Sequence, residues 1–146
     1  MIRGHRACLD FHSRLEILDF VLAVTECAGR HAGLDDESRQ SVALAVREAL
    51  INAITHGNAS NEAKRVVVEI SPVDDDGPGL AICVRDSGPG FDPDRVPDCR
   101  SPEHALEPHG RGLFLIRSVM DALVLQRAPG GGMRVLMIKR LQATPA

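Results

Sequence analysis

The chain has 146 residues, of which 17 are basic and 20 acidic, so its formal net charge is −3. This length suits one domain over residues 1–146, and a hydrophobic content of 44% excludes disorder as the main state. A nucleic-acid-binding protein needs positive surface and often aromatic rings that stack on bases. A net charge of −3, with four Phe, no Trp and no Tyr, argues against that function. No apolar run approaches the ~18 residues of a membrane span.

The cysteines and the N-terminus bear on the cellular compartment. Cys8, Cys27, Cys83 and Cys99 form no CxxC pair and are too sparse for a disulfide framework, so we expect them to be reduced. The first residues lead into no apolar core of the signal-peptide kind. Together these features predict a cytoplasmic protein.

The first part of the chain predicts a strand and two helices. Ala7–Phe11 is short and mostly apolar, which favours a strand. Leu and Val then recur at helical spacing, so a helix is expected with Ser13 as its N-cap and an end near Gly33. Acidic residues from Asp35 open a second helix, which should run to residue 56 and end on a left-handed Gly57.

The rest of the chain predicts two hairpins separated by a loop and a helix. The four predicted strands are Arg65–Ser71, Leu80–Arg85, Ala122–Arg127 and Met133–Arg140. Residues 86–109 show little periodicity, and a loop of this length is usually functional. A helix is expected over Gly112–Asp121. This order predicts an α+β two-layer sandwich, with helices on one face of a mixed, mostly antiparallel sheet.

The second predicted helix carries a polar stripe. Glu48, Asn52 and His56 stand four residues apart, which places them on one face. The adjoining arc is apolar and must face the core, so the stripe borders the core. A carboxylate and an amide at such an edge suggest a site, and a solvated helix flank is the plainer alternative. A His in the last turn suits the helix dipole, so we expect no catalytic role for His56.

Two glycine-bearing segments accompany the stripe. Asp86–Gly90 (DSGPG) directly follows a predicted strand. Its glycines permit close backbone approach to a ligand and its Asp can accept from an amino group, although a plain turn is the alternative. Gly110–Leu113 (GRGL) opens a helix, where free N–H groups and the positive dipole end form a phosphate cradle. No Gly-Lys-Ser/Thr is present, so this is not a Walker A loop.

The three segments, in this order, resemble the N, G1 and G2 boxes of the GHKL superfamily of histidine kinase-like ATPases. Residues 48–58 (EALINAITHGN) are similar to the N box, 86–91 (DSGPGF) to G1 and 110–116 (GRGLFLI) to G2. His-Gly after the N box and Met-Asp at 120–121 narrow the likeness to anti-sigma-factor serine kinases of the RsbW and SpoIIAB type. The likeness reaches from the first strand to Leu141 and implies the GHKL fold.

The resemblance implies an ATP site with bound Mg²⁺. Asn52 would ligate the metal, and Glu48 would be the catalytic base toward a hydroxyl. Asp86 would accept from the adenine amino group, and residues 91–109 would form a lid. The nucleotide-binding residues implied are Asn52, Asp86, Gly88, Gly90, Gly110, Arg111, Gly112 and Leu113.

One position departs from the family pattern. The family usually has Gly-Thr at the start of the last strand, where the Thr helps to hold adenine, and this chain has Gly132-Met133. The departure predicts a lower affinity for ATP.

The resemblance implies an ATP-binding anti-sigma factor that is also a serine kinase. It would phosphorylate a serine on a STAS-domain anti-anti-sigma antagonist and would sequester a sigma factor in its ATP-bound state; a homodimer is typical of such proteins. An alternative is an ATP-binding partner-switch module with little or no kinase activity, which Met133 favours. The catalytic domain of a two-component histidine kinase suits the chain less well, because only a strand's length precedes the first helix.

Overall fold

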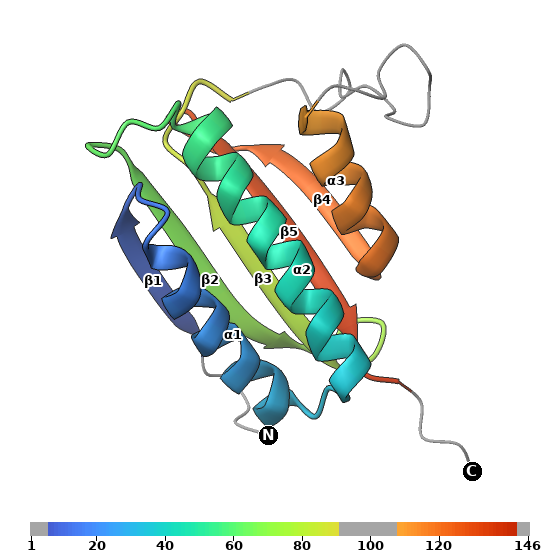
Figure 1. Cartoon of the computed structure of the whole chain (residues 1–146). Coiled ribbons are helices and arrows are strands. Elements are labelled where there is room, and N and C mark those ends of the chain that lie inside the picture. The colour runs from blue at the N-terminus through green and yellow to red at the C-terminus, as the bar shows by residue number, and fades with distance from the viewer. Residues whose placement is uncertain (1–5, 91–107, 143–146) are drawn as a thin grey trace.

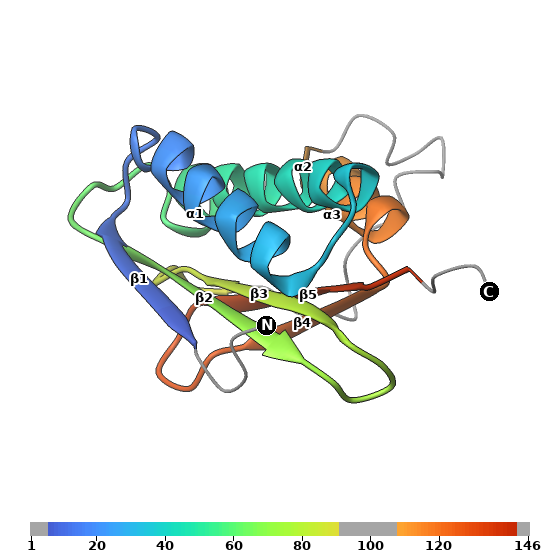
Figure 2. The ribbon, with the colours of Figure 1, turned by 90° about the horizontal axis from the view of Figure 1, so that it is seen from below.

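The computed structural model describes residues 6–90 and 108–142, with the side chains of residues 108–111 excepted. These residues form a five-stranded sheet in the order β1-β2-β3-β5-β4, and helices cover one of its faces (Figures 1 and 2). Each neighbouring pair of strands is antiparallel, so the sheet is antiparallel throughout rather than mixed. The predicted α+β two-layer sandwich is confirmed.

The five strands are β1 (Ala7–His12), β2 (Arg65–Val73), β3 (Gly79–Arg85), β4 (Ala122–Arg127) and β5 (Met133–Arg140). Their apolar residues align in rows because alternate side chains of a strand share one face. The register sets Val68 opposite Val84, and Ile82 opposite both Ile70 and Met137. All five side chains are at most 3% exposed and lie in the core beneath the helices.

Three α-helices lie side by side on this face: α1 (Ile17–Ala32), α2 (Asp36–Asn52) and α3 (Pro108–Val119). The central one is α2, which packs against α1, α3 and the sheet (Figure 1). Its predicted apolar arc does face the core, since Val42, Val46, Ala49, Leu50, Ala53 and Ile54 are all buried. Full burial of a side chain such as Leu50 contributes about 2 kcal/mol to folding. Within the described residues no helix is both long enough and apolar enough to cross a membrane.

The connection from β1 to α1 differs from the prediction. Ser13 is not the N-cap of α1, which begins at Ile17 after an intervening turn. The Ser13 side chain is 1% exposed, and its backbone N–H donates to the Lys64 carbonyl at 2.9 Å. Its hydroxyl has no hydrogen-bond partner among the described residues. Tertiary packing therefore overrides the local capping preference of this serine.

The turn between α1 and α2 follows the prediction. Gly33 ends α1 with φ +91°, the left-handed conformation that glycine adopts without strain. Asp35 is the N-cap of α2, and its Oδ1 accepts from the Ser38 N–H at 2.8 Å. This hydrogen bond holds the pKa of Asp35 below its ordinary value.

Two other helix boundaries were predicted wrongly. The α-helical part of α2 ends at Asn52 and continues as a π-helical turn, η1 (Ala53–Gly57), instead of running to His56. The third helix begins at Pro108, four residues before the predicted start at Gly112. Proline suits the first position of a helix because its missing N–H would have no partner there.

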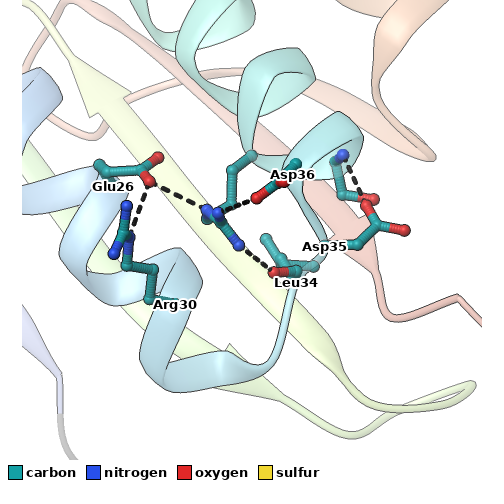
Figure 3. A network of polar contacts seen from close by, with 7 residues as sticks. Glu26, Arg30, Leu34, Asp35 and Asp36 are labelled. Carbon is teal, nitrogen blue, oxygen red and sulfur yellow. Dashed lines mark hydrogen bonds and ion pairs between the residues drawn. The ribbon is translucent and has the colours of Figure 1, made fainter.

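Arg39, in the first turn of α2, joins α2 to α1. Figure 3 labels its partners Glu26, Leu34 and Asp36. The Arg39 guanidinium donates to Glu26 at 2.9 Å, to the Leu34 carbonyl at 2.6 Å and to Asp36. Glu26 also accepts from Arg30 at 3.0 Å, and this bond is the largest influence that places the pKa of Glu26 below its ordinary value. The Arg39 side chain is 16% exposed and that of Arg30 is 69% exposed.

Replacing Arg39 with Ala should lower the melting temperature by roughly 5 °C, because both the ion pair between the helices and the Leu34 carbonyl contact are lost. The matched control is Arg30→Ala, which removes an exposed pair on the same Glu26 and should change the melting temperature by about 1 °C or less. Circular dichroism measures both transitions. Equal shifts in the two variants would contradict a junction role for Arg39.

Candidate functional site

A cavity of about 250 Å³ opens where the end of α2, α3 and the adjoining ends of β3 and β5 meet. Most of its wall is apolar, and Asn52, His56 and Asp86 are its main polar side chains. The lining residues are Ala49, Asn52, Ala53, His56, Gly57, Val84, Asp86, Pro89, Gly90, Leu113, Ile116, Met133 and Val135. A mostly apolar cavity with a few convergent polar groups is the usual form of a small-molecule site.

Asp86 directly follows β3 and is 8% exposed. Its Oδ1 accepts from the Gly88 N–H at 2.9 Å and from the Met133 N–H at 3.3 Å, and its own N–H donates to the Met133 carbonyl at 3.1 Å. Among the described residues, none hydrogen-bonds to Oδ2. The main chain thus fixes one oxygen of a carboxylate that lines the cavity and leaves the other oxygen without a partner in the described part of the chain.

Burial raises the pKa of Asp86 above its ordinary value, and the hydrogen bonds from Gly88 and Met133 oppose this rise. The folded chain therefore holds this proton more tightly than the unfolded chain does. Above the raised pKa the ionised Asp86 makes folding less favourable, and this cost disappears as the pH falls and the carboxyl is protonated. A buried carboxylate that costs stability in a cavity is a functional-site candidate.

Two glycines bring η1 against the turn that follows β3. A Cβ on Gly57 would lie 2.2 Å from Asp86 Oδ2, and a Cβ on Gly88 would lie 1.7 Å from the Gly57 carbonyl oxygen. Neither position has room for a side chain. The predicted left-handed cap at Gly57 is wrong, because its φ is not positive. Glycine is needed there for contact with Asp86.

The turn before β5 closes the other side of the cavity. Gly132 has φ +85°, and a Cβ on it would lie 2.1 Å from the Asp86 carbonyl oxygen. The next residue, Met133, is 2% exposed and presents its side chain to the cavity wall. The cavity wall thus carries an apolar thioether at this position, and the lower ATP affinity expected from Met133 stays a prediction.

Asn52 connects the cavity to α3. A Cβ on Gly112 would lie 2.7 Å from Asn52 Nδ2, so the amide rests directly on the glycine backbone. No hydrogen bond joins this amide to any of the residues that the structure describes. Glu48 lies one turn earlier on α2, is half-buried and does not line the cavity. Of the three residues in the polar stripe, Asn52 and His56 therefore line the cavity and Glu48 does not.

The structure gathers most of the predicted site residues. Four line the cavity: Asn52, Asp86, Gly90 and Leu113. Two lie immediately behind its wall: Gly88 and Gly112. Gly110 and Arg111 belong to the start of α3, where the first N–H groups lack intrahelical acceptors, whereas residues 112 and 113 follow that first turn. The predicted lid falls largely on residues 91–107, outside the described residues.

Sequence reasoning missed the apolar walls. Val84 and Val135 pair across β3 and β5 and both line the cavity. Val84 stands two residues before Asp86 and Val135 two residues after Met133. Because alternate residues of a strand share one face, this spacing could have predicted both. His56 also lines the cavity, although no catalytic role is predicted for it.

The family described as "Histidine kinase-like ATPase domain" matches residues 11–139. The chain belongs to this family. The matched residues include all three segments of the predicted site, 48–58, 86–91 and 110–116. Because the family is defined by an ATPase domain, membership implies ATP binding.

Curated relatives narrow the comparison. An anti-sigma F factor of Clostridium perfringens is 29% identical over 109 residues, which cover 72% of this chain and 74% of the relative. An anti-sigma F factor of Clostridium novyi is 29% identical over 144 residues, 96% and 97% of the two chains. The serine-protein kinase RsbW of Oceanobacillus iheyensis is 30% identical over 104 residues, 67% of this chain and 64% of that protein.

Solved structures share the fold. The RsbU and RsbW domains of a Mycobacterium tuberculosis protein match with a TM-score of 0.66 and 17% identity, over 94% of this chain and 33% of that chain. The histidine kinase domain of an Erythrobacter litoralis blue-light activated histidine kinase matches with a TM-score of 0.50 and 21% identity, over 85% of this chain and 61% of that one. This chain therefore spans only part of each of these proteins.

Replacing Asp86 with Asn should raise the melting temperature at neutral pH, because the amide keeps an oxygen for the two main-chain N–H groups without a buried charge. The difference from the wild type should shrink as the pH falls through the raised pKa of Asp86. Thermal unfolding of both proteins across acidic and neutral pH measures this difference. A constant difference at every pH would contradict the assigned cost of ionisation.

Proposed function

We propose that this protein binds Mg·ATP in the cavity and acts as an anti-sigma factor and serine kinase of the partner-switching type. One observation carries the nucleotide assignment. A fixed, buried carboxylate, Asp86, lines an apolar cavity, and its Oδ2 has no hydrogen-bond partner among residues 6–90 and 112–142. Adenine offers a flat apolar ring and one amino group, which match this wall and this acceptor.

The neighbouring groups support a place for the phosphates. The start of α3 provides backbone N–H groups and the positive end of a helix dipole, which favour phosphate. Asn52 lies between this helix and the cavity, and its amide makes no hydrogen bond within the described part of the chain. Mg²⁺ commonly takes one or two protein oxygens and completes its shell with water and phosphate oxygens. Asn52 Oδ1 fits such a single ligand, and the ion would neutralise phosphate charge when bound.

Glu48 is the proposed catalytic base. It stands one turn from Asn52 on the same helix, at the edge of the site. Its carboxylate would accept the proton of an incoming serine hydroxyl as the serine oxygen bonds to the γ-phosphorus of ATP. The bond from that phosphorus to the β–γ bridging oxygen breaks, and ADP leaves with the electron pair. The products are a phosphoserine and ADP.

The partners are proposed from the relatives. Curated relatives named anti-sigma F factor and serine-protein kinase RsbW support a sigma factor as one client and a STAS-domain antagonist as the phosphorylated protein. The ATP-bound protein would hold the sigma factor. Phosphorylation of the antagonist would release the antagonist and leave the protein free to bind the sigma factor. We propose the cytoplasm as the location, and the free thiols of Cys8, Cys27 and Cys83 support a reducing compartment.

A second candidate is a nucleotide-binding switch with little or no kinase activity. Two observations favour it: Met133 presents no hydroxyl to the cavity, and Glu48 does not line it. In this case the protein would regulate a sigma factor or another client by binding alone. The two candidates differ in whether phosphate reaches a protein serine.

Replacing Glu48 with Ala should reduce phosphate transfer to a STAS-domain protein by about 10²–10⁴-fold, because the proton acceptor is lost. ATP affinity should be unchanged. Transfer is measured with γ-labelled ATP and affinity by calorimetry. Glu37→Ala, in the exposed first turn of the same helix, is the matched control. Unchanged transfer in the Glu48 variant would contradict the role of Glu48 as catalytic base. Absence of transfer by the wild type would favour the second candidate.

Capture of partners from the native lysate tests the switch itself. Tagged protein is loaded with Mg·ATP in one arm and Mg·ADP in the other, and bound proteins are identified by mass spectrometry. We expect a sigma factor enriched with ATP and a STAS protein enriched with ADP. The Asp86→Asn variant, which loses the adenine acceptor, should abolish the difference between arms. Capture of neither protein in either arm would overturn the proposed partners.

A further inference from the structure

Asn58 is a fully buried polar residue just beyond η1. Its exposed fraction is 0%, a value that is rare for an asparagine. Burying an amide costs free energy unless its hydrogen bonds are made within the protein. The placement of those bonds therefore shows what the residue holds together.

The Asn58 side chain connects the residues after η1 with the start of β2 and with the turn after β3. Its Nδ2 donates to the Arg65 carbonyl at the start of β2, at 3.0 Å. Its Oδ1 accepts from the Ser87 N–H in the turn after β3, at 2.8 Å. The Ser87 hydroxyl donates to the same Arg65 carbonyl at 3.2 Å, which closes a triangle of hydrogen bonds.

The backbone of Asn58 is itself fixed. Its N–H donates to the Ala53 carbonyl at 2.8 Å, a π-type bond over five residues. Its carbonyl accepts from the Asn61 N–H at 2.9 Å. An amide anchored at both its backbone and its side-chain atoms has one orientation, and it transmits the position of η1 to Ser87.

Ser87 lies between Asp86, which carries the carboxylate, and Gly88, whose N–H donates a hydrogen bond to Asp86 Oδ1. The tight contacts of Gly57 with Asp86 and of Gly88 with the Gly57 carbonyl lie beside the Asn58–Ser87 bond. This bond is thus a polar tie that keeps the 86–88 turn against η1.

We infer that Asn58 is a positioning residue for the proposed nucleotide site: it orients Asp86 Oδ2 through Ser87. The inference rests on the proposed function, in which Asp86 distinguishes the amino group of adenine from the carbonyl oxygen that guanine carries at the same place. A purely structural role for Asn58 would weaken binding of both nucleotides equally. A positioning role reduces the preference for ATP over GTP.

The test compares ATP and GTP affinities, by calorimetry, for the wild type, Asn58→Ala and Asn61→Ala. Asn61 is the matched control, because its side chain is exposed and, among the described residues, accepts only from the Ala63 N–H in the same loop. We expect Asn58→Ala to weaken ATP binding about tenfold and to lower the ATP/GTP preference by a similar factor, and Asn61→Ala to change neither. An unchanged ATP/GTP preference in a folded Asn58→Ala protein would overturn the inference.

Combination with Asp86→Asn gives a second, independent readout. If Asn58 acts through Asp86, adding Asn58→Ala to Asp86→Asn should leave the ATP/GTP preference unchanged. A further loss of preference in the double variant would contradict the pathway through Asp86. Should Asn58→Ala fail to fold, Asn58→Ser, in which water can replace part of the amide, takes its place in every measurement.

Amide hydrogen exchange without nucleotide separates this inference from the proposed function. The Gly88 and Met133 N–H groups, both bound to Asp86 Oδ1, should exchange about tenfold faster in the Asn58 variant than in Asn61→Ala. A wild type that binds no ATP would refute the proposed function, and exchange would then decide the role of Asn58 alone. Equal exchange in the two variants would refute the positioning role.

Discussion

The carboxylate of Asp86 occupies a place in the β3–β5 ladder that belongs to a main-chain carbonyl. In an antiparallel hydrogen-bonded pair, two residues exchange both of their N–H···O bonds. Asp86 gives its N–H to the Met133 carbonyl, yet the Met133 N–H goes to the Asp86 side chain. One oxygen thereby ends the ladder and fixes the turn at Gly88, and the second oxygen has no hydrogen-bond partner among the described residues. The cavity exists where regular pairing stops.

Steric constraint explains why the segments around this carboxylate are rich in glycine. Side chains at Gly57, Gly88 and Gly132 would overlap Asp86 or the backbone that supports it. These glycines are required by contacts within the protein, whether or not a ligand is bound. The close approach of three chain segments to one another accounts for these glycines, and the closeness of the Gly88 backbone to a ligand stays a prediction.

Local patterns predicted the fold well and the site boundaries less well. The apolar arc of α2, the acidic start of that helix and the end of α1 at Gly33 depend on nearby residues, and all three predictions are confirmed. The errors at Ser13 and Gly57 arise from contacts with residues far along the chain, which a local pattern does not contain. The grouping of the three segments into one site was available only through the family resemblance. Asn58 could not be told from an ordinary loop asparagine.

The strand order has a consequence for stability. After β3 the chain leaves the sheet through α3, returns at the edge strand β4, and then runs back as β5 beside β3. Asp86 and Met133 therefore meet across 47 positions of sequence. Closing such a loop costs chain entropy. A molecule in the cavity touches both ends of the closed loop, and by mass action it opposes their separation more strongly as its concentration rises. For the proposed nucleotide, the resistance of this sheet to opening would follow the supply of ATP in the cell.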